Sequence, residues 1–295
     1  MSQPYAEVIG DPISQSKSPA IHKFWIDRSG LSADYRACHV TPADLADYIS
    51  TRRKDSLWRG CNVTMPHKQA VIPFLERLDP QAEKIGAVNT IIPEPDGSLT
   101  GYNTDADGFL EPLRKMLGHS HLFRMARIIG TGGASRAIIV ALAAHGFVIV
   151  LAGRNPQKAK ALLDELDPAG EHHTAPLEHF ASSTDFAFDD RAGCLDLVIN
   201  ASPLGMNGQP DLVIDFSHVP PGSIIYDIIT DPVDTPLLKE AKTHGLQTIN
   251  GLSMLIGQAA IAFEKFFDCA PDRDDDDALR AQLKRWMGSD TGLAG

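Results

Sequence analysis

The chain has 295 residues, which is enough for two domains, and 43% of them are hydrophobic, so we expect a folded core rather than disorder. Lys and Arg total 27 against 38 Asp and Glu, and the formal net charge is -11. This acidic balance argues against general binding to nucleic acid or to an anionic membrane. Any phosphate site must therefore be local, built from backbone N–H groups and a few cations.

The cysteines and the N-terminus point to a reducing compartment. Cys38, Cys61, Cys194 and Cys269 are scattered and form no CxxC pair, so neither a disulfide framework nor a metal site is indicated. The N-terminus lacks the basic start and apolar core of a signal peptide, and no apolar run approaches membrane-spanning length. We expect a cytoplasmic protein without a membrane anchor.

The first half of the chain alternates expected strands and helices, which indicates an open parallel or mixed α/β sheet. The expected strands cover 6–10, 35–40, 58–64 and 86–92, with a hairpin turn at 95–97. The expected helices cover 20–28, a segment that Thr41 caps, 69–75, and 106 to about 117.

The stretch from Cys61 to Lys68 is the first candidate for chemistry. It has the pattern of a strand end and a turn, with Lys68 opening a helix. Helix N–H groups and apolar neighbours both disfavour a charged ammonium, as an acid/base lysine requires. The alternative is a solvated surface lysine.

Three further residues allow two interpretations each. Ser16 and Ser18 precede an expected helix that Pro19 starts, and they are either helix caps or hydroxyls aimed at a polyhydroxylated ligand. Asp105 could be a simple N-cap of the helix that follows it.

The second half begins with a dinucleotide-binding pattern. An expected strand at 126–129 feeds the glycine turn 130–136, a helix at 137–145 and a strand at 147–152, all within about 30 residues. Gly130 permits the tight turn, and Gly132 lets the backbone approach a pyrophosphate, which N–H groups at the helix start would hold. Ser135 occupies the place of the third motif glycine.

Two cations follow the second strand of this pattern. NAD sites usually place an acid there to hold the ribose hydroxyl, whereas basic residues suit a 2′-phosphate. Arg154 and Lys158 stand at this position, one helical turn apart, and no acid does. The alternative is two solvated cations at a helix start, but their position favours NADP(H).

The remaining chain continues the α/β alternation. Strands are expected at 195–200 and 222–229, and the loop 201–206 after the first of them would lie on the cofactor side of the sheet. A polar connection at 182–193 precedes these strands. Helices are expected from Thr235 to near Gly245, at 253–267 and, after an acidic turn at 272–277, at 278–287. Gln258 falls on an apolar helix, where a buried glutamine needs partners.

Taken together, the sequence resembles the shikimate dehydrogenase family. The motifs that carry the resemblance run in the family's order from residue 9 to about 262, at 16–19, 62–68, 86–90, 103–105 with 108–109, 130–136, 200–206 and 251–259.

The resemblance implies a two-domain α/β fold. Residues 1–104 would form an N-terminal α/β substrate domain that the returning C-terminal helices, 251–295, complete. Residues 105–250 would form a Rossmann-type domain that binds NADP, with the active site in the cleft between the domains.

The resemblance also implies roles for individual residues. Lys68 would be the acid/base and Asp105 its partner. The substrate would be held by Ser16, Ser18, Thr64, Asn89, Asp105, Gln258 and Thr230. The cofactor would be held by Gly130, Thr131, Gly132, Gly133, Ala134, Gly153, Arg154, Asn155, Lys158, Ser202, Ile228, Gly251 and Met254.

The implied reaction is the reversible, NADP-dependent reduction of 3-dehydroshikimate to shikimate on the chorismate route to aromatic amino acids. The partners would be small molecules, and the protein a monomer or homodimer. Two positions depart from the family's pattern. Lys158 replaces the second arginine of the basic pair, and Thr230 replaces a substrate-contacting tyrosine, which puts substrate preference in doubt.

Two rival functions stay open. The nearer is a quinate/shikimate dehydrogenase that uses NAD or has relaxed preference, although Ser18 is often threonine in members that favour quinate. The more remote is a nucleotide-sensing paralogue without turnover, which would have no need of Lys68 and Asp105 together.

Overall fold

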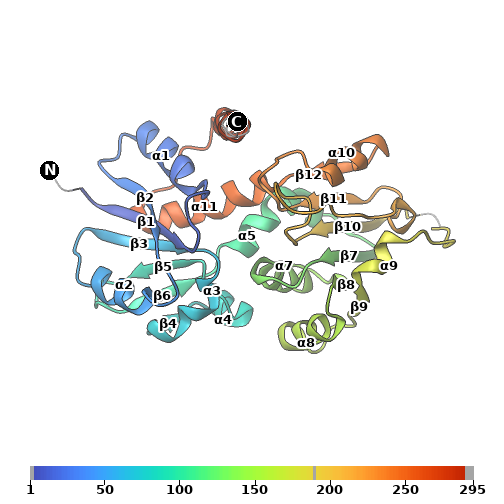
Figure 1. Ribbon diagram of the computed structural model, residues 1–295, viewed down its shortest axis with the longest axis horizontal. Helices are drawn as coiled ribbons and strands as arrows, with labels where there is room; N and C mark the ends of the chain where they lie inside the picture. Colours follow the sequence, from blue (N-terminus) through green and yellow to red (C-terminus); the bar gives the residue numbers. More distant parts are fainter. Residues whose placement is uncertain (1–2, 189–190, 290–295) are drawn as a thin grey trace. The chain divides into compact units, whose positions relative to one another are not determined.

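A computed structural model describes residues 3–188 and 191–289 (Figure 1). The chain divides into two compact α/β units. The first unit holds the residues up to 108 and those from 256 onward, and the second unit holds residues 109–255. The chain passes between them within α5 (Asp105–Leu110) and within α11 (Gly251–Phe267). The two-unit α/β architecture predicted from the sequence is confirmed.

The first unit is built on a mixed six-stranded sheet in the order β2-β1-β3-β5-β6-β4. β1 pairs in parallel with β2 and β3, whereas β5 runs antiparallel to both β3 and β6, and β4 is parallel to β6. The strands are β1 (Tyr5–Gly10), β2 (Asp34–His39), β3 (Trp58–Val63), β4 (Arg77–Leu78), β5 (Thr90–Pro93) and β6 (Leu99–Tyr102). The turn predicted at 95–97 joins β5 to β6, with Gly97 in the left-handed region at φ 82°.

Apolar side chains cover this sheet. Leu45, Tyr48 and Ile49 of α2 (Leu45–Arg52) pack with Ile9 of β1 and Ile91 of β5. The other helices of this unit are α1 (Ser18–Ser29), α3 (His67–Ala70), α4 (Pro80–Ile85) and α12 (Asp276–Ser289), with part of α5 and most of α11.

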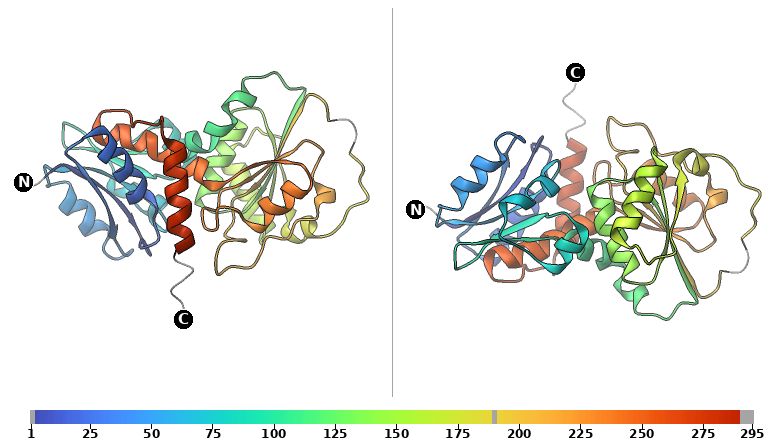
Figure 2. Two further views of the ribbon diagram at one scale, coloured as in Figure 1. Left: turned by 90° about the horizontal axis from the view of Figure 1, so that it is seen from above. Right: turned by 90° about the horizontal axis from the view of Figure 1, so that it is seen from below.

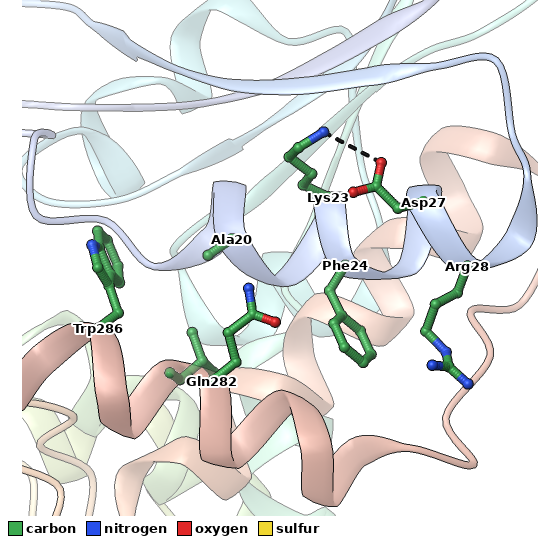
Figure 3. Close-up of a pocket in the computed structure, with 8 residues that line it drawn as sticks. Ala20, Lys23, Phe24, Asp27, Arg28, Gln282 and Trp286 are labelled. Atoms are coloured by element: carbon green, nitrogen blue, oxygen red, sulfur yellow. Dashed lines mark hydrogen bonds and ion pairs between the residues drawn. The ribbon is translucent and has the colours of Figure 1, made fainter.

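Helix α12 lies beside α1 (Figure 2). Figure 3 shows the groove between these two helices, where Phe24 and Gln282 approach each other and Trp286 lines one end. Arg28 ties the helices together, because its Nη2 lies 2.5 Å from Asp275 Oδ2. The acidic turn predicted before the last helix therefore anchors α12 on α1.

The second unit is a parallel six-stranded sheet in the order β12-β11-β10-β7-β8-β9. Counted along the chain, this is the strand order 3-2-1-4-5-6 of the doubly wound dinucleotide-binding fold. The strands are β7 (Phe123–Ile129), β8 (Val148–Gly153), β9 (His173–Pro176), β10 (Cys194–Asn200), β11 (Ile224–Asp227) and β12 (Gln247–Ile249). The helices are α6 (Arg114–Leu117), α7 (Gly133–Ala143), α8 (Pro156–Leu166), α9 (Leu177–Ala181) and α10 (Pro236–Thr243).

Prolines and a glycine explain where the predicted elements were wrong. The helix expected at 106–117 is broken into α5, a 3₁₀ turn that contains Pro112, and α6, since proline lacks the N–H that a continuous helix needs. The helix expected at 69–75 is α3 and a 3₁₀ turn with Pro73. The strand expected at 86–92 begins only at Thr90, because Gly86 ends α4 in the left-handed conformation.

Two predicted helix caps were also wrong. Ser18 is the buried first residue of α1, whose N-cap is Lys17 without a capping side chain, although Ser16 Oγ lies 3.4 Å from the Ser18 amide. Thr41 precedes α2 by a full turn, and its hydroxyl donates to Asp44 Oδ2 at 2.6 Å. Residues 189–190 of the predicted polar connection lie outside the described residues. Within 3–188 and 191–289, every helix is too short or too polar to cross a lipid bilayer.

His22 of α1 is a buried histidine that makes no hydrogen bond among the described residues. Its ring stacks on Tyr35 with the centroids 3.9 Å apart, and burial lowers its pKa to about 3. In the unfolded chain a histidine titrates near 6.5, so between these two values the unfolded state binds the additional proton. The free energy of unfolding must therefore fall as pH falls from about 6.5 towards 3, and this contribution is constant above 6.5.

We predict that His22→Phe removes this acid sensitivity while keeping the stacked ring. The difference in unfolding free energy between the variant and the wild type should increase by about 2–3 kcal/mol, in favour of the variant, when the pH is lowered from 7 to 4.5. Urea denaturation at several pH values measures the gain. His119→Phe, at an exposed histidine, is the control and should keep the wild-type slope. Equal slopes for wild type and His22→Phe would contradict the prediction.

Candidate active site and cofactor site

Lys68 and Asp105 meet in the first unit. Lys68 is the second residue of α3, Asp105 is the first residue of α5, and Lys68 Nζ donates to Asp105 Oδ2 at 2.5 Å. The lysine side chain is 21% exposed and the aspartate side chain 8%. The described side-chain partner of the amine is a carboxylate, and the expected influence of helix N–H groups and apolar neighbours stays a prediction. The simple N-cap interpretation of Asp105 is superseded by these side-chain partners.

One turn of backbone positions both partners. The Val88 amide donates to Lys68 O at 2.7 Å. Asn103 Nδ2 donates to Ala87 O at 2.8 Å, and Asn103 Oδ1 accepts from the Asp105 amide at 3.0 Å. The residues of the turn 87–88 therefore hold the backbones from which the amine and the carboxylate project.

Asn89 is the junction of the polar side chains around this pair. Its Nδ2 donates to Asp105 Oδ1 at 2.9 Å and to Thr104 Oγ1 at 2.9 Å, and it lies 3.5 Å from Gln258 Oε1. Its Oδ1 accepts from the Thr104 amide at 2.8 Å. Gln258, which the sequence placed on an apolar helix in need of partners, is buried and contacts this junction.

The other predicted substrate residues of the first unit lie on neighbouring elements. Ser16 is half-buried just before α1, and Ser18 is buried in its first turn. Thr64 is half-buried directly after β3, where its amide donates to Ile9 O at 2.9 Å. The three residues supply hydroxyls, Asn89 supplies an amide, Lys68 an amine and Asp105 a carboxylate. These groups suit a ligand with several hydroxyl groups.

The glycine turn lies where the order of the second sheet reverses, between β7 and β10. Gly130 has φ 118°, and a Cβ there would lie 2.6 Å from the backbone oxygen of Ala201, which follows β10. Gly132 is the N-cap of α7, and a Cβ there would meet nothing within 4 Å. An exposed helix N-terminus at the reversal point is where such folds bind a pyrophosphate. Thr131, Gly133 and Ala134 complete this turn.

The residues after β8 leave two cations exposed. Arg154 and Lys158 are exposed, and neither forms an ion pair with the described part of the chain. The side chain of Asn155 caps α8, because its Oδ1 accepts from the Lys158 amide at 3.0 Å. Gly153 packs against the Thr131 methyl group, which a Cβ would approach to 3.0 Å. Lys158 lies in the first turn of α8, where the helix dipole mildly disfavours a positive charge, so an anion bound beside it would be favourable.

The remaining predicted cofactor residues lie on loops of the second unit or in the first turn of α11. Gly251, at the start of α11, is packed so closely that a Cβ would lie 2.3 Å from the backbone oxygens of Ile228 and Ile229. Ser202 donates through its amide and its hydroxyl to Asn200 Oδ1. Met254 and Thr230 also belong to this unit, Met254 buried and Thr230 half-buried.

Asp227 organises these loops, and the sequence analysis missed it. Its Oδ1 accepts from Asn200 Nδ2 at 3.1 Å and from the Ile229 amide at 3.0 Å, and its Oδ2 accepts from Thr235 Oγ1 at 2.7 Å. The side chain is fully buried, and burial raises the pKa of its carboxyl group. The available signal was an aspartate that ends an otherwise apolar strand.

Fold and sites together define a doubly wound dinucleotide-binding protein with a second α/β unit that carries a lysine–aspartate pair. Two family models match the chain: "Shikimate dehydrogenase substrate binding domain" at residues 8–91 and "Shikimate 5'-dehydrogenase C-terminal domain" at residues 251–276. A shikimate dehydrogenase (NADP(+)) of Sphingopyxis alaskensis is 46% identical over 284 residues, which cover 96% of this chain and 97% of the relative. The chain belongs to the shikimate dehydrogenase family.

Solved structures agree with this membership. A shikimate dehydrogenase in complex with NADP+ has a TM-score of 0.83 at 32% identity, and the match covers 97% of this chain and 96% of the other. The enzyme of Thermus thermophilus in complex with NADP(H) and shikimate has a TM-score of 0.76 at 31% identity, and the match covers 97% and 100%. The family predicted from the sequence is confirmed.

We predict that Gly130→Ala destabilises the second unit, because alanine at φ 118° is strained and its Cβ collides with Ala201 O. The strain should cost about 1–3 kcal/mol and lower the midpoint of thermal unfolding by about 3–10 °C. Calorimetry measures the midpoint. Gly132→Ala, which meets nothing, is the matched control and should keep the wild-type midpoint. An unchanged midpoint for Gly130→Ala would show that the turn has another conformation.

Proposed function

We propose that this protein is an NADP-dependent shikimate dehydrogenase that catalyses the reversible reduction of 3-dehydroshikimate to shikimate. Residues 1–104, completed by 251–295, bind the substrate, and residues 105–250 bind NADP. Asp105 lies at the boundary between these two segments, and its carboxylate contacts Lys68 in the first unit. The enzyme works in the cytoplasm on the route to chorismate, as a monomer or homodimer.

The contact between Lys68 Nζ and Asp105 Oδ2 at 2.5 Å is the observation that carries the proposal. A partly exposed amine next to a buried carboxylate is of no use to a protein that only binds a nucleotide. It is useful to an enzyme that moves a proton to or from a hydroxyl group.

The residues of the first unit perform the proton chemistry. When bound, NADPH supplies the hydride for the C3 ketone of 3-dehydroshikimate. Lys68 gives a proton to the oxygen at C3 during reduction and takes it back during oxidation. Asp105 holds the amine in position through its hydrogen bond. Ser16, Ser18, Thr64, Asn89 and Gln258 bind the other hydroxyls and the carboxylate of the substrate, so that the ring has one orientation.

The second unit fits NADP for three reasons. Gly132 leaves open space at the N-terminus of α7 for a pyrophosphate. Arg154 and Lys158 are exposed and lack carboxylate partners in the described chain, so they can pair with a 2′-phosphate. No acid that could hold a ribose hydroxyl of NAD lies between Gly153 and Leu163. Gly251, Met254, Ser202 and Ile228 are assigned to the nicotinamide end.

A second candidate is a dehydrogenase that accepts quinate as well. Thr230 stands where the family usually has a substrate-contacting tyrosine, so the aromatic hydroxyl is missing from this position. Ser18 favours shikimate over quinate, and the exposed cations favour NADP over NAD. We therefore rank quinate second.

Turnover assays of shikimate and quinate with NADP and with NAD test this proposal directly, and shikimate with NADP should give the highest kcat/KM. We predict that Lys68→Ala lowers kcat by about 10²–10⁴-fold with a far smaller change in KM, because the acid/base group is lost. Lys84→Ala, at an exposed lysine of α4, is the control. A near-normal kcat for Lys68→Ala would remove this residue from the mechanism.

We predict that Arg154→Ala raises KM for NADPH about tenfold or more and leaves KM for NADH nearly unchanged. The reason is that a hydrogen-bonded charge on the 2′-phosphate is lost. Steady-state kinetics with both cofactors measure the difference. Lys160→Ala, at an exposed cation of α8 that pairs with Asp164, should change neither value. Equal effects on both cofactors would defeat the NADP assignment.

A further inference from the structure

A chain of hydrogen bonds runs through the first unit and ends at Asp105. Tyr35 Oη donates to Asn62 Oδ1 at 2.6 Å, and Asn62 Nδ2 donates to Thr90 Oγ1 at 3.0 Å. Thr90 Oγ1 donates to Asn89 Oδ1 at 3.0 Å, and Asn89 Nδ2 donates to Asp105 Oδ1 at 2.9 Å. The chain thus connects β2, β3 and β5 to the start of α5.

The first three residues of this chain, Tyr35, Asn62 and Thr90, have no role in the reaction proposed above. Tyr35 is 4% exposed, Asn62 is 5% exposed and Thr90 is 0% exposed, so bulk water does not compete for their polar groups. Buried polar groups need partners, and a network of them has few alternative arrangements. A change in one link must therefore be felt at its neighbours.

All links of the chain donate in the same direction. Because the oxygen of the Asn62 amide accepts from Tyr35, its nitrogen faces Thr90 and the backbone oxygen of Asn89. The Thr90 hydroxyl, which accepts from Asn62, is left to donate to Asn89 Oδ1. The Asn89 amide therefore has its oxygen on the Thr90 side and offers its nitrogen to Asp105. The chain and the Thr104 amide, which also donates to Asn89 Oδ1, together determine which end of Asn89 faces the site.

The far end of the chain lies against α1. The ring of His22 on α1 stacks on the ring of Tyr35 and fixes the plane of that phenol. Burial raises the pKa of Tyr35 well above its ordinary value, so the phenol stays protonated and remains a donor. Tyr35, packed against α1, and Asn89, before β5, are thus joined through the buried side chains of Asn62 and Thr90.

We propose that Tyr35, Asn62 and Thr90 are positioning residues of the shikimate site, which hold Asn89 in the one arrangement that fits the substrate. The inference rests on the proposed function. The three residues act through Asn89, by fixing the orientation of its side-chain amide.

Substitution of Thr90 tests the middle of the chain. Thr90→Val keeps the shape and removes the hydroxyl, so Asn89 Oδ1 loses one of its two donors and only the Thr104 amide still holds that end of the side chain. KM for shikimate should rise about tenfold, and KM for NADP should stay within about twofold, since loss of a buried hydrogen bond acts on the substrate site alone. Thr90→Ser keeps the hydroxyl and should restore KM to near the wild-type value. A merely structural role would lower the active fraction without changing KM.

Tyr35→Phe tests the other end of the hydrogen-bond chain, and it tests the positioning role even if Thr90→Val does not fold. It keeps the ring on His22 and removes the first donor, and KM for shikimate should rise about threefold to tenfold. The matched control is Tyr48→Phe, which removes another buried hydroxyl, one that donates to Glu7 Oε2 at 2.8 Å outside this chain. Its KM for shikimate should stay unchanged.

Two outcomes would overturn the inference, and they are distinguishable. If wild-type enzyme turns over shikimate with NADP, but Thr90→Val and Tyr35→Phe keep the wild-type KM, the positioning role fails alone. If the wild-type enzyme does not turn over shikimate, the proposed function fails and the positioning role fails with it.

Discussion

The carboxylate of Asp105 is the group on which the first unit depends. A carboxylate that is 8% exposed is costly to bury unless charges and hydrogen-bond donors surround it, and here one oxygen meets the Lys68 amine and the other the Asn89 amide. The backbone turn 87–88 holds both partners, and the antiparallel pairing of β5 with β3 brings Asn62 opposite Thr90. The mixed sheet therefore fixes the geometry of the polar site, and not only the core.

The second unit uses a similar device for a different purpose. Asp227 is a buried carboxylate that three donors surround, and these donors come from the ends of β10 and β11 and from the cap of α10. Gly130 lies against the loop that follows β10, close enough to exclude any side chain. A buried acid and a glycine thus shape the loops at the reversal of the parallel sheet, where doubly wound folds bind their ligands.

Local pattern was sufficient to predict most of the longer strands, the glycine turn and the motifs, because each depends on neighbours within a few residues. It missed the short strands β4, β9 and β12. It failed at Pro73 and Pro112, where an apolar period suggested helices that proline interrupts. It predicted Lys68 and Asp105 as a pair only through the family resemblance. Asp227 was missed although it ends an apolar strand, and local pattern could not reveal the chain from Tyr35 to Asn89. Tyr35 and Asn62 are 27 residues apart, and their contact depends on the strand register.

The central claim is that the amine of Lys68, the carboxylate of Asp105 and the amide of Asn89 form one preorganised site for a hydroxylated ring. A crystal structure of the protein with bound shikimate tests it most directly. The account predicts electron density for the ring against these three side chains, with the amine in hydrogen-bonding reach of both a ring hydroxyl and the Asp105 carboxylate. A ring bound elsewhere, or a Lys68 side chain turned away from Asp105, would contradict it.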